Sequence, residues 1–167
     1  SVSVRNVAER AGYSYATLYN YFKDIKDLIF ECVKDFQEEC EVFVREEAGT
    51  ARRGKDRIEA FAMAYARFFI QYPGIFELFF IERMTEVGHR GPTLNLIVTF
   101  LDRLCQQEWA YCLEKGTFPK EETVFRKERL NALITGLLLL YINRNHPADY
   151  ADFVKTARRQ VRCILDS

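Results

Sequence analysis

The 167-residue sequence has few of the side chains from which enzyme active sites and metal centres are built. It contains two histidines, His89 and His146, both in loop-like segments, and its five cysteines form no Cys-x-x-Cys pair. Catalysis usually needs a nucleophile beside a base, a pair of carboxylates or a metal cluster. None of these can be assembled convincingly from the residues present, so we expect no enzyme activity and no metal or cofactor.

The odd number of cysteines also argues against a disulfide framework. We interpret them as free, mostly buried thiols of a protein in the reducing cytoplasm. Because Cys105 and Cys112 are one heptad apart and can share a helix face, a redox or metal role is the alternative. The five residues are Cys32, Cys40, Cys105, Cys112 and Cys163.

A long hydrophobic run and a net charge are absent as well. The longest apolar stretch, residues 130–142, is interrupted by Asn131, Thr135 and Gly136, and a membrane span needs about 20 apolar residues. We therefore expect no membrane partner. The 24 basic side chains balance the 24 acidic ones, so no overall field attracts the protein to nucleic acid. Any affinity for DNA must come from local contacts.

Strand-like alternation is missing too, and helical periodicity takes its place throughout. We therefore predict an all-α fold. The apolar stripes and the breaks between them predict helices over residues 4–11, 14–22, 24–47, 58–72, 75–84, 93–115, 120–144 and 148–166. Residues 31–47 carry seven acidic and two basic side chains, which we interpret as a solvated face.

The stretch from Val4 to Lys23 predicts a helix-turn-helix. Apolar or small residues recur at i, i+3, i+4 and i+7 from Val4 to Ala11. Gly12 follows, where a helix ends and the chain needs a positive φ. Ser14 is a natural N-cap for the second helix. That helix presents polar-tipped and no acidic side chains on its free face, so it can enter a major groove without repelling phosphate.

This spacing resembles the N-terminal signature of the TetR-family transcriptional regulators, over roughly residues 3–30. The residues that carry the resemblance are Val7, Ala8, Ala11, Gly12, Tyr13, Ser14, Thr17, Leu18, Tyr19, Tyr21, Phe22 and Leu28. Members of that family usually have an additional, often basic helix before this motif. Since the sequence starts at Ser1, inside the expected domain, we expect that first helix to be missing from it.

The resemblance implies a DNA-binding regulator with an operator on double-stranded DNA. We expect Tyr15, Thr17 and Tyr21 to face bases or nearby phosphates, and Ser3, Tyr19 and Lys23 to grip the backbone. Ser14 and Lys26 complete the predicted DNA-binding set, although Ile25 stands where the family commonly has a lysine. The resemblance also implies two parts, a DNA-binding domain with its linking helix over residues 1–47 and an effector-binding and dimerisation domain over residues 48–167.

Aromatic residues crowd the segment 61–80 and predict either an ordinary core or an effector pocket, since ligand sites of helical bundles lie between facing helices. The candidate pocket residues are Tyr65, Phe69, Phe76, Phe80, Phe100 and Trp109. An effector there would be apolar or aromatic, and we predict a repressor that it releases from DNA. The Tyr65 hydroxyl, the Trp109 N–H and Glu82 are its candidate polar contacts.

The last two predicted helices carry more apolar surface than one internal contact can cover. We therefore predict a homodimer with a four-helix interface, the arrangement that the resemblance also implies. The predicted interface residues are Leu133, Leu137, Leu140 and Tyr141 on the first helix and Phe153, Ala157, Val161 and Ile164 on the second. The alternative function is that of a helical dimeric interaction protein that binds no DNA.

Overall fold

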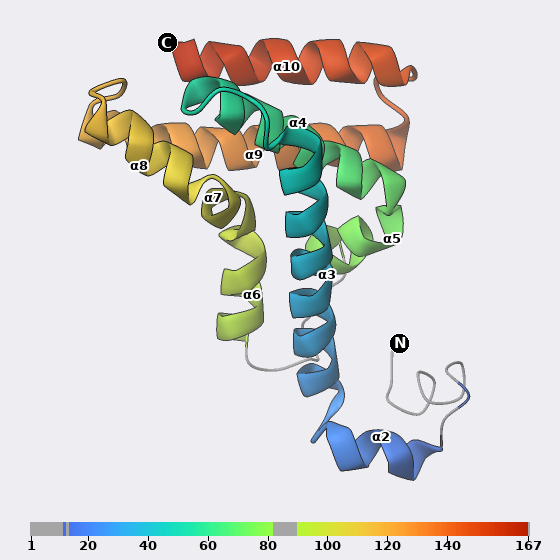
Figure 1. Ribbon diagram of the computed structural model, residues 1–167. Coiled ribbons are helices and arrows are strands. Elements are labelled where there is room, and N and C mark those ends of the chain that lie inside the picture. The colour runs from blue at the N-terminus through green and yellow to red at the C-terminus, as the bar shows by residue number, and fades with distance from the viewer. Residues whose placement is uncertain (1–11, 13, 82–89, 167) are drawn as a thin grey trace.

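The computed structural model describes residue 12, residues 14–81 and residues 90–166. Every regular element among them is a helix, so the predicted all-α class is confirmed (Figure 1). One short helix, α2 (Tyr15–Tyr21), stands at one end, and α3 (Ile25–Ala48) connects it to a helical body. The helix predicted over residues 4–11 lies outside the described residues.

Side-chain caps fix the start of α2 and of α3. The Ser14 hydroxyl accepts a hydrogen bond from the Thr17 amide at 3.1 Å, and Asp24 Oδ1 accepts one from the Asp27 amide at 3.1 Å. Such bonds satisfy amides that have no partner in the first turn of a helix. Gly12 has the positive φ that the turn before α2 requires, 73°. The predicted cap at Ser14 is therefore present, and Asp24 caps α3 in the same way.

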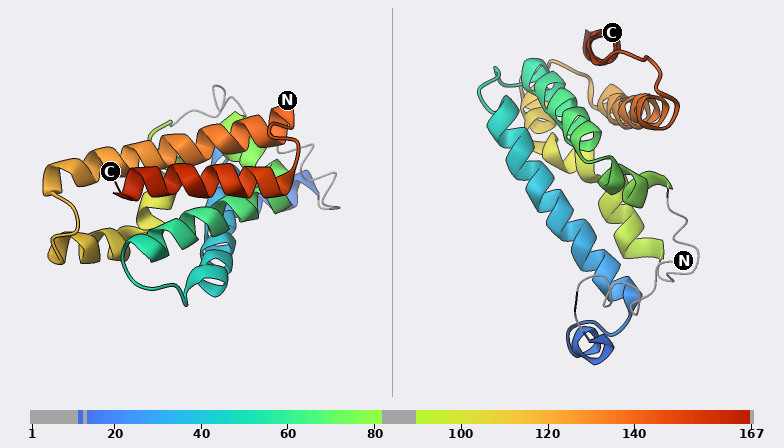
Figure 2. Two further views of the ribbon diagram at one scale, coloured as in Figure 1. Left: turned by 90° about the horizontal axis from the view of Figure 1, so that it is seen from above. Right: turned by 90° about the vertical axis from the view of Figure 1, so that its right-hand side faces the viewer.

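The body is built around α4 (Lys55–Gln71), which packs against α3, α9 (Lys120–Arg144) and α10 (Tyr150–Asp166). Seen from above, α10 lies between α9 and α4 (Figure 2). Eight of the 17 residues of α4 are buried, and three phenylalanines and three alanines are among them. In the described part of the chain, no helix is long and apolar enough to cross a membrane.

The helix predicted over residues 93–115 is three helices in the structure, α6 (Arg90–Val98), α7 (Phe100–Leu104) and α8 (Gln106–Glu114). The first break is at Thr99, whose hydroxyl donates a hydrogen bond to the Asn95 carbonyl at 2.7 Å. A threonine bonded to the carbonyl four residues earlier bends a helix. The second break is at Cys105 (φ −89°, ψ 0°), and nothing in its side chain explains it.

The segment predicted as a helix over residues 75–84 also differs. A short α5 (Pro73–Phe76) begins two residues earlier, because proline is favoured in the first turn of a helix. It continues as a π-helical turn, η1 (Glu77–Ile81). Phe76 of α5 and Phe79 of the π-helical turn are both buried in the core.

Candidate functional site

The free face of α2 is the candidate DNA-binding surface, and it lies at the end of the molecule opposite to α10 (Figure 1). Tyr21 is 78% exposed, and Ser14 and Lys23 are exposed as well. Thr17 is half-buried, and its hydroxyl lies 2.7 Å from that of Ser14. The structure therefore groups Ser14 and Thr17 at the start of the helix, with Tyr21 and Lys23 at its end. Ser3 lies outside the described residues, as do the side chains of Tyr15, Tyr19 and Lys26.

Five of the six predicted pocket residues form one network of rings. Tyr65 lies with its ring centroid 4.8 Å from that of Phe69 and 5.7 Å from that of Phe100. Phe69 in turn contacts Phe76 and Phe80, each at 5.8 Å. All except the half-buried Phe80 are at most 3% exposed. Burial raises the pKa of Tyr65, so its hydroxyl stays protonated and neutral.

Trp109, the sixth residue, is also buried but packs elsewhere. Its ring contacts Phe118 at 5.8 Å, at the end of the body where α8 approaches α9. Its indole Nε1 is buried and has no hydrogen-bond partner among the residues that the structure describes. A buried donor left unpaired costs about 1–3 kcal/mol, so an acceptor brought there by a ligand would be favoured. Glu82 lies outside the described residues.

A buried glutamine connects the aromatic network to α3. Gln37 is 6% exposed, and its Nε2 donates a hydrogen bond to the Leu96 carbonyl at 2.8 Å. Arg103 Nη2 donates to Gln37 Oε1 at 2.6 Å and to the same Leu96 carbonyl at 3.2 Å. The Arg103 guanidinium lies 5.7 Å from the centre of the Phe100 ring. Contacts thus run from Phe100 to α3, the helix that leads to the candidate DNA-binding surface.

The sequence contains a signal for the Gln37 bridge, by which we mean the hydrogen bonds that join Gln37 to the Leu96 carbonyl and to Arg103. Gln37, Cys40 and Val44 follow Val33 at i+4, i+7 and i+11, so all four residues lie on one stripe of α3. A polar side chain in an otherwise apolar stripe must find a buried partner. The stripe indicates that such a partner exists, but it does not identify the Leu96 carbonyl, which accepts these bonds beside the break at Thr99.

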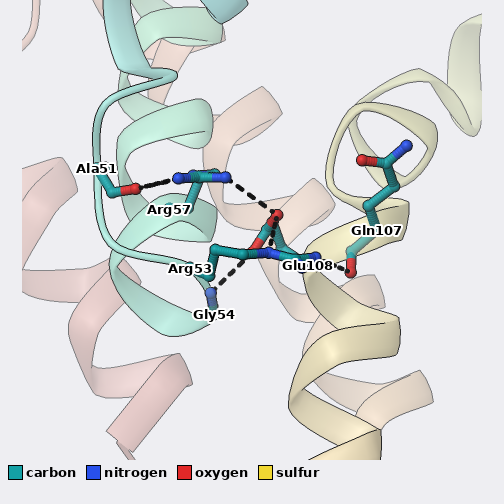
Figure 3. Close-up of polar contacts among 6 residues, drawn as sticks. All are labelled: Ala51, Arg53, Gly54, Arg57, Gln107 and Glu108. Carbon is teal, nitrogen blue, oxygen red and sulfur yellow. Dashed lines mark hydrogen bonds and ion pairs between the residues drawn. The ribbon is translucent and has the colours of Figure 1, made fainter.

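A second buried polar cluster fastens α8 to the loop after α3 (Figure 3). Glu108 is 3% exposed, and its Oε2 accepts a hydrogen bond from the Gly54 amide at 2.8 Å. Its Oε1 lies 3.3 Å from Arg53 Nε and 3.6 Å from Arg57 Nη1. Arg57 also donates through Nε and Nη2 to the Ala51 carbonyl, at 2.8 and 2.6 Å. Gly54 adopts φ 89°, a conformation that glycine tolerates best.

The structure corrects one half of the predicted dimer interface. On α10 the four predicted residues, Phe153, Ala157, Val161 and Ile164, are at most 6% exposed within the single chain. They form the contact of α10 with α9 and α4; for example, the rings of Phe153 and Tyr141 lie 4.8 Å apart. The periodicity identifies the apolar face correctly but assigns it to the wrong partner.

On α9 the predicted residues keep surface that another chain can cover. Leu140 is 44% exposed, and Leu133, Leu137 and Tyr141 are half-buried. A Cβ at Gly136, on the same side of α9, would meet no atom within 4 Å. This side of α9 therefore has both apolar side chains and room for close approach.

The cysteines differ in exposure, which makes their reactivity testable. Cys163 is exposed and Cys32 is half-buried, whereas Cys40, Cys105 and Cys112 are buried. Burial raises the pKa of these last three, and the thiolate is the reactive form. We expect a thiol reagent to label Cys163 first, Cys32 more slowly and the buried three only in denaturant. Mass spectrometry after timed labelling will check this order, with Cys163→Ser as the control; early labelling of Cys40 would contradict it.

Comparison with known proteins agrees with these features. Residues 1–32 match the family model of bacterial regulatory proteins of the tetR family. The fold is similar to the crystal structure of a transcriptional regulator of the TetR/AcrR family from Thermobifida fusca YX-ER1, with a TM-score of 0.54 and 17% sequence identity. That likeness covers 99% of this chain and 86% of the other. No curated protein matches the sequence. Residues 1–32 therefore match the tetR family of bacterial regulatory proteins, and the chain as a whole shares the fold of a TetR/AcrR-family transcriptional regulator.

Proposed function

We propose that the chain is a repressor whose α2 binds operator DNA and which a small apolar or aromatic effector releases. The observation that carries this proposal is the Gln37 bridge. It ties the helix that leads to α2 to the Leu96 carbonyl and to Arg103, which lies against the ring of Phe100. A ligand that changes the position of Phe100 therefore acts on α3. By linkage, the effector and DNA must favour different arrangements of this contact.

The proposed effector site is the ring network around Phe69, whose aromatic rings supply apolar contact. Trp109 lies apart from this network, against Phe118, so its fluorescence responds to an effector there through the packing of α8 against α4 and α7. Residues 48–167 would then hold the effector, and residues 1–47 would carry the response to DNA. The exposed side of α9 around Leu140 is the proposed contact between two copies.

DNA binding is tested with duplexes selected by the chain from a random pool. We expect Lys23→Ala to weaken all selected duplexes alike, because a phosphate contact carries no sequence information. Thr17→Ala should change the sequence preference, by about 1–3 kcal/mol at the base concerned, and Thr17→Ser should preserve the hydroxyl bond to Ser14. Gel-shift titrations will measure both effects.

Lys120→Ala is the matched control, since Lys120 is exposed at the start of α9. It should leave every affinity unchanged. If wild-type chain binds no duplex from the pool, the repressor proposal fails and the alternative of an interaction protein without DNA binding takes its place.

Effector binding is tested by the fluorescence of Trp109, the single tryptophan of the chain. Among apolar and aromatic compounds, we expect some to change this fluorescence and to lower DNA affinity together. Phe69→Ala should weaken both effects to the same degree, because it removes a ring at the centre of the network. A compound set that shifts the fluorescence without any change in DNA affinity would contradict the coupling.

A further inference from the structure

The outer surface of α10, together with Arg67 of α4, forms a groove of about 810 Å³ that the proposed function does not use. Its lining residues are Arg67, Tyr150, Ala151, Val154, Lys155, Arg158, Arg159, Arg162, Cys163 and Asp166. Five of these side chains are cationic and one is acidic. Since the chain as a whole has no net charge, the groove concentrates positive charge on one surface.

Three of the arginines are held in place by partners at the edge of the groove. Glu59, whose side chain is 15% exposed, binds Arg158 Nε through Oε1 at 3.3 Å and Arg162 Nε through Oε2 at 2.8 Å. Arg67 donates through Nε to the Tyr150 hydroxyl at 3.2 Å and pairs with Glu47.

The ion pairs with Glu59 use only the Nε groups of Arg158 and Arg162, so the other guanidinium donors can bind a ligand. In the described part of the chain, the Nη groups of Arg158 and Arg162 have no partner. An arginine that is already ordered loses less side-chain entropy when it binds a carboxylate. The groove is thus prepared for anionic groups.

Two more cations of the groove, Lys155 and Arg159, form no ion pair or hydrogen bond with any residue that the structure describes. With Arg158 and Arg162 they recur at i, i+3, i+4 and i+7, which places them along one side of α10. At about 1.5 Å per residue, the row from Lys155 to Arg162 is about 10 Å long. It suits a series of negative charges better than a single small anion.

The floor of the groove is apolar. Ala151 and Val154 line it, together with Cys163 and the ring of Tyr150, which stacks on Phe153 with 13° between the ring planes. A partner that fits both the cations and this floor has acidic and apolar side chains on adjacent faces. An amphipathic helix has that pattern, and laying such a helix in an apolar groove is a common mode of recognition.

We propose that this groove binds an acidic amphipathic helix of another protein. Nucleic acid fits less well, because a phosphate backbone offers no apolar side chains to the apolar lining of Ala151, Val154 and Tyr150. The helix along which the groove runs, α10, lies at the end of the molecule opposite to α2 (Figure 1), so a protein bound there leaves the proposed DNA-binding surface free.

The test uses a labelled synthetic helical peptide of 16 residues, with glutamate along one face and leucine along the adjacent one, and the full chain. We expect fluorescence anisotropy to show saturable binding that weakens as salt is added. The double charge reversal Lys155→Glu/Arg159→Glu should weaken it at least about tenfold, because like charges across a contact are strongly unfavourable. Both positions are exposed, so the unfolding midpoint should stay at the wild-type value.

The matched control is Lys120→Glu/Arg144→Glu, which makes the same change in charge at the two exposed ends of α9. It should bind the peptide as wild type does. A peptide of equal composition with its glutamates spread around the helix should bind more weakly. The proposal is overturned if both double variants bind alike, or if polyphosphate or duplex DNA of equal charge displaces the peptide at lower concentration than unlabelled peptide does. Operator affinity, measured on the same variants, should not change, which separates this test from that of the proposed function.

Discussion

Glu108→Ala should lower the free energy of unfolding by about 3 kcal/mol, because it removes the acceptor of a buried amide and of two guanidinium groups. Gly54 N–H has its 2.8 Å bond to this carboxylate, and Arg53 and Arg57 lie on the other oxygen. The solvent exposure of Arg53 reduces its share of the loss. Urea denaturation followed by circular dichroism will measure the change.

Two variants show whether the loss comes from the buried contacts. Glu114→Ala, on the same helix, removes an exposed carboxylate whose partner Lys115 is also exposed, so it should change stability by less than about 0.5 kcal/mol. Glu108→Gln keeps an acceptor of similar shape and should fall between the two. Equal effects of the alanine variants at positions 108 and 114 would show that the cluster contributes nothing beyond a surface charge.

Leu140→Asp should convert a dimer into monomers that remain folded. By two-fold symmetry each substitution occurs twice in the interface, and burying one leucine contributes about 1.5–3 kcal/mol. We therefore expect the dimer dissociation constant to rise at least about 100-fold. Sedimentation velocity will report the mass. DNA affinity should fall as well, because a dimer places two recognition helices on half-sites about 34–36 Å apart.

The control is Leu94→Asp, on α6, where a leucine of similar exposure, 51%, lies away from α9. It should leave both the mass and the DNA affinity unchanged. Val161→Asp should instead unfold the chain, since Val161 is fully buried against its own core. A wild-type chain that sediments as a monomer at micromolar concentration would exclude the dimer.

Sequence patterns predict those parts of the fold that depend on neighbouring residues. Ser14 and Asp24 mark the starts of α2 and α3 because a cap acts within one turn. The limits of α9 agree with the predicted 120–144, because Pro119 directly before the helix and Asn145, left-handed directly after it, act locally as well. The break at Thr99 is different, because a threonine hydroxyl in a helix can either face solvent or bond to the carbonyl four residues earlier, and residue type alone does not decide between the two.

The candidate site is less predictable, because its polar contacts join residues far apart in the sequence. Gln37 and Leu96 are 59 positions apart, and Gly54 and Glu108 are 54 apart. Periodicity marks which side of α10 is apolar, but a monomer core and a dimer interface require the same side chains. Only the position of α10 between α9 and α4 assigns that side to the core. The contact of Tyr65 with Phe69 follows from their spacing of four along α4, whereas the approach of Phe100 and the separate environment of Trp109 depend on how the helices pack.

The position of Gln37 within α3 gives that helix the proportions of a lever. Gln37 stands near the middle of α3, about 17 Å from the Ala48 end and about 18 Å from the Ile25 end at 1.5 Å per residue. The Glu108 cluster fastens the loop just beyond Ala48, so that end is the natural fulcrum. A rotation about it moves Ile25 about twice as far as Gln37. A shift of about 1 Å, enough to lengthen the bond to the Leu96 carbonyl beyond hydrogen-bonding range, thus becomes about 2 Å at the start of α3, next to α2, the proposed DNA-binding helix.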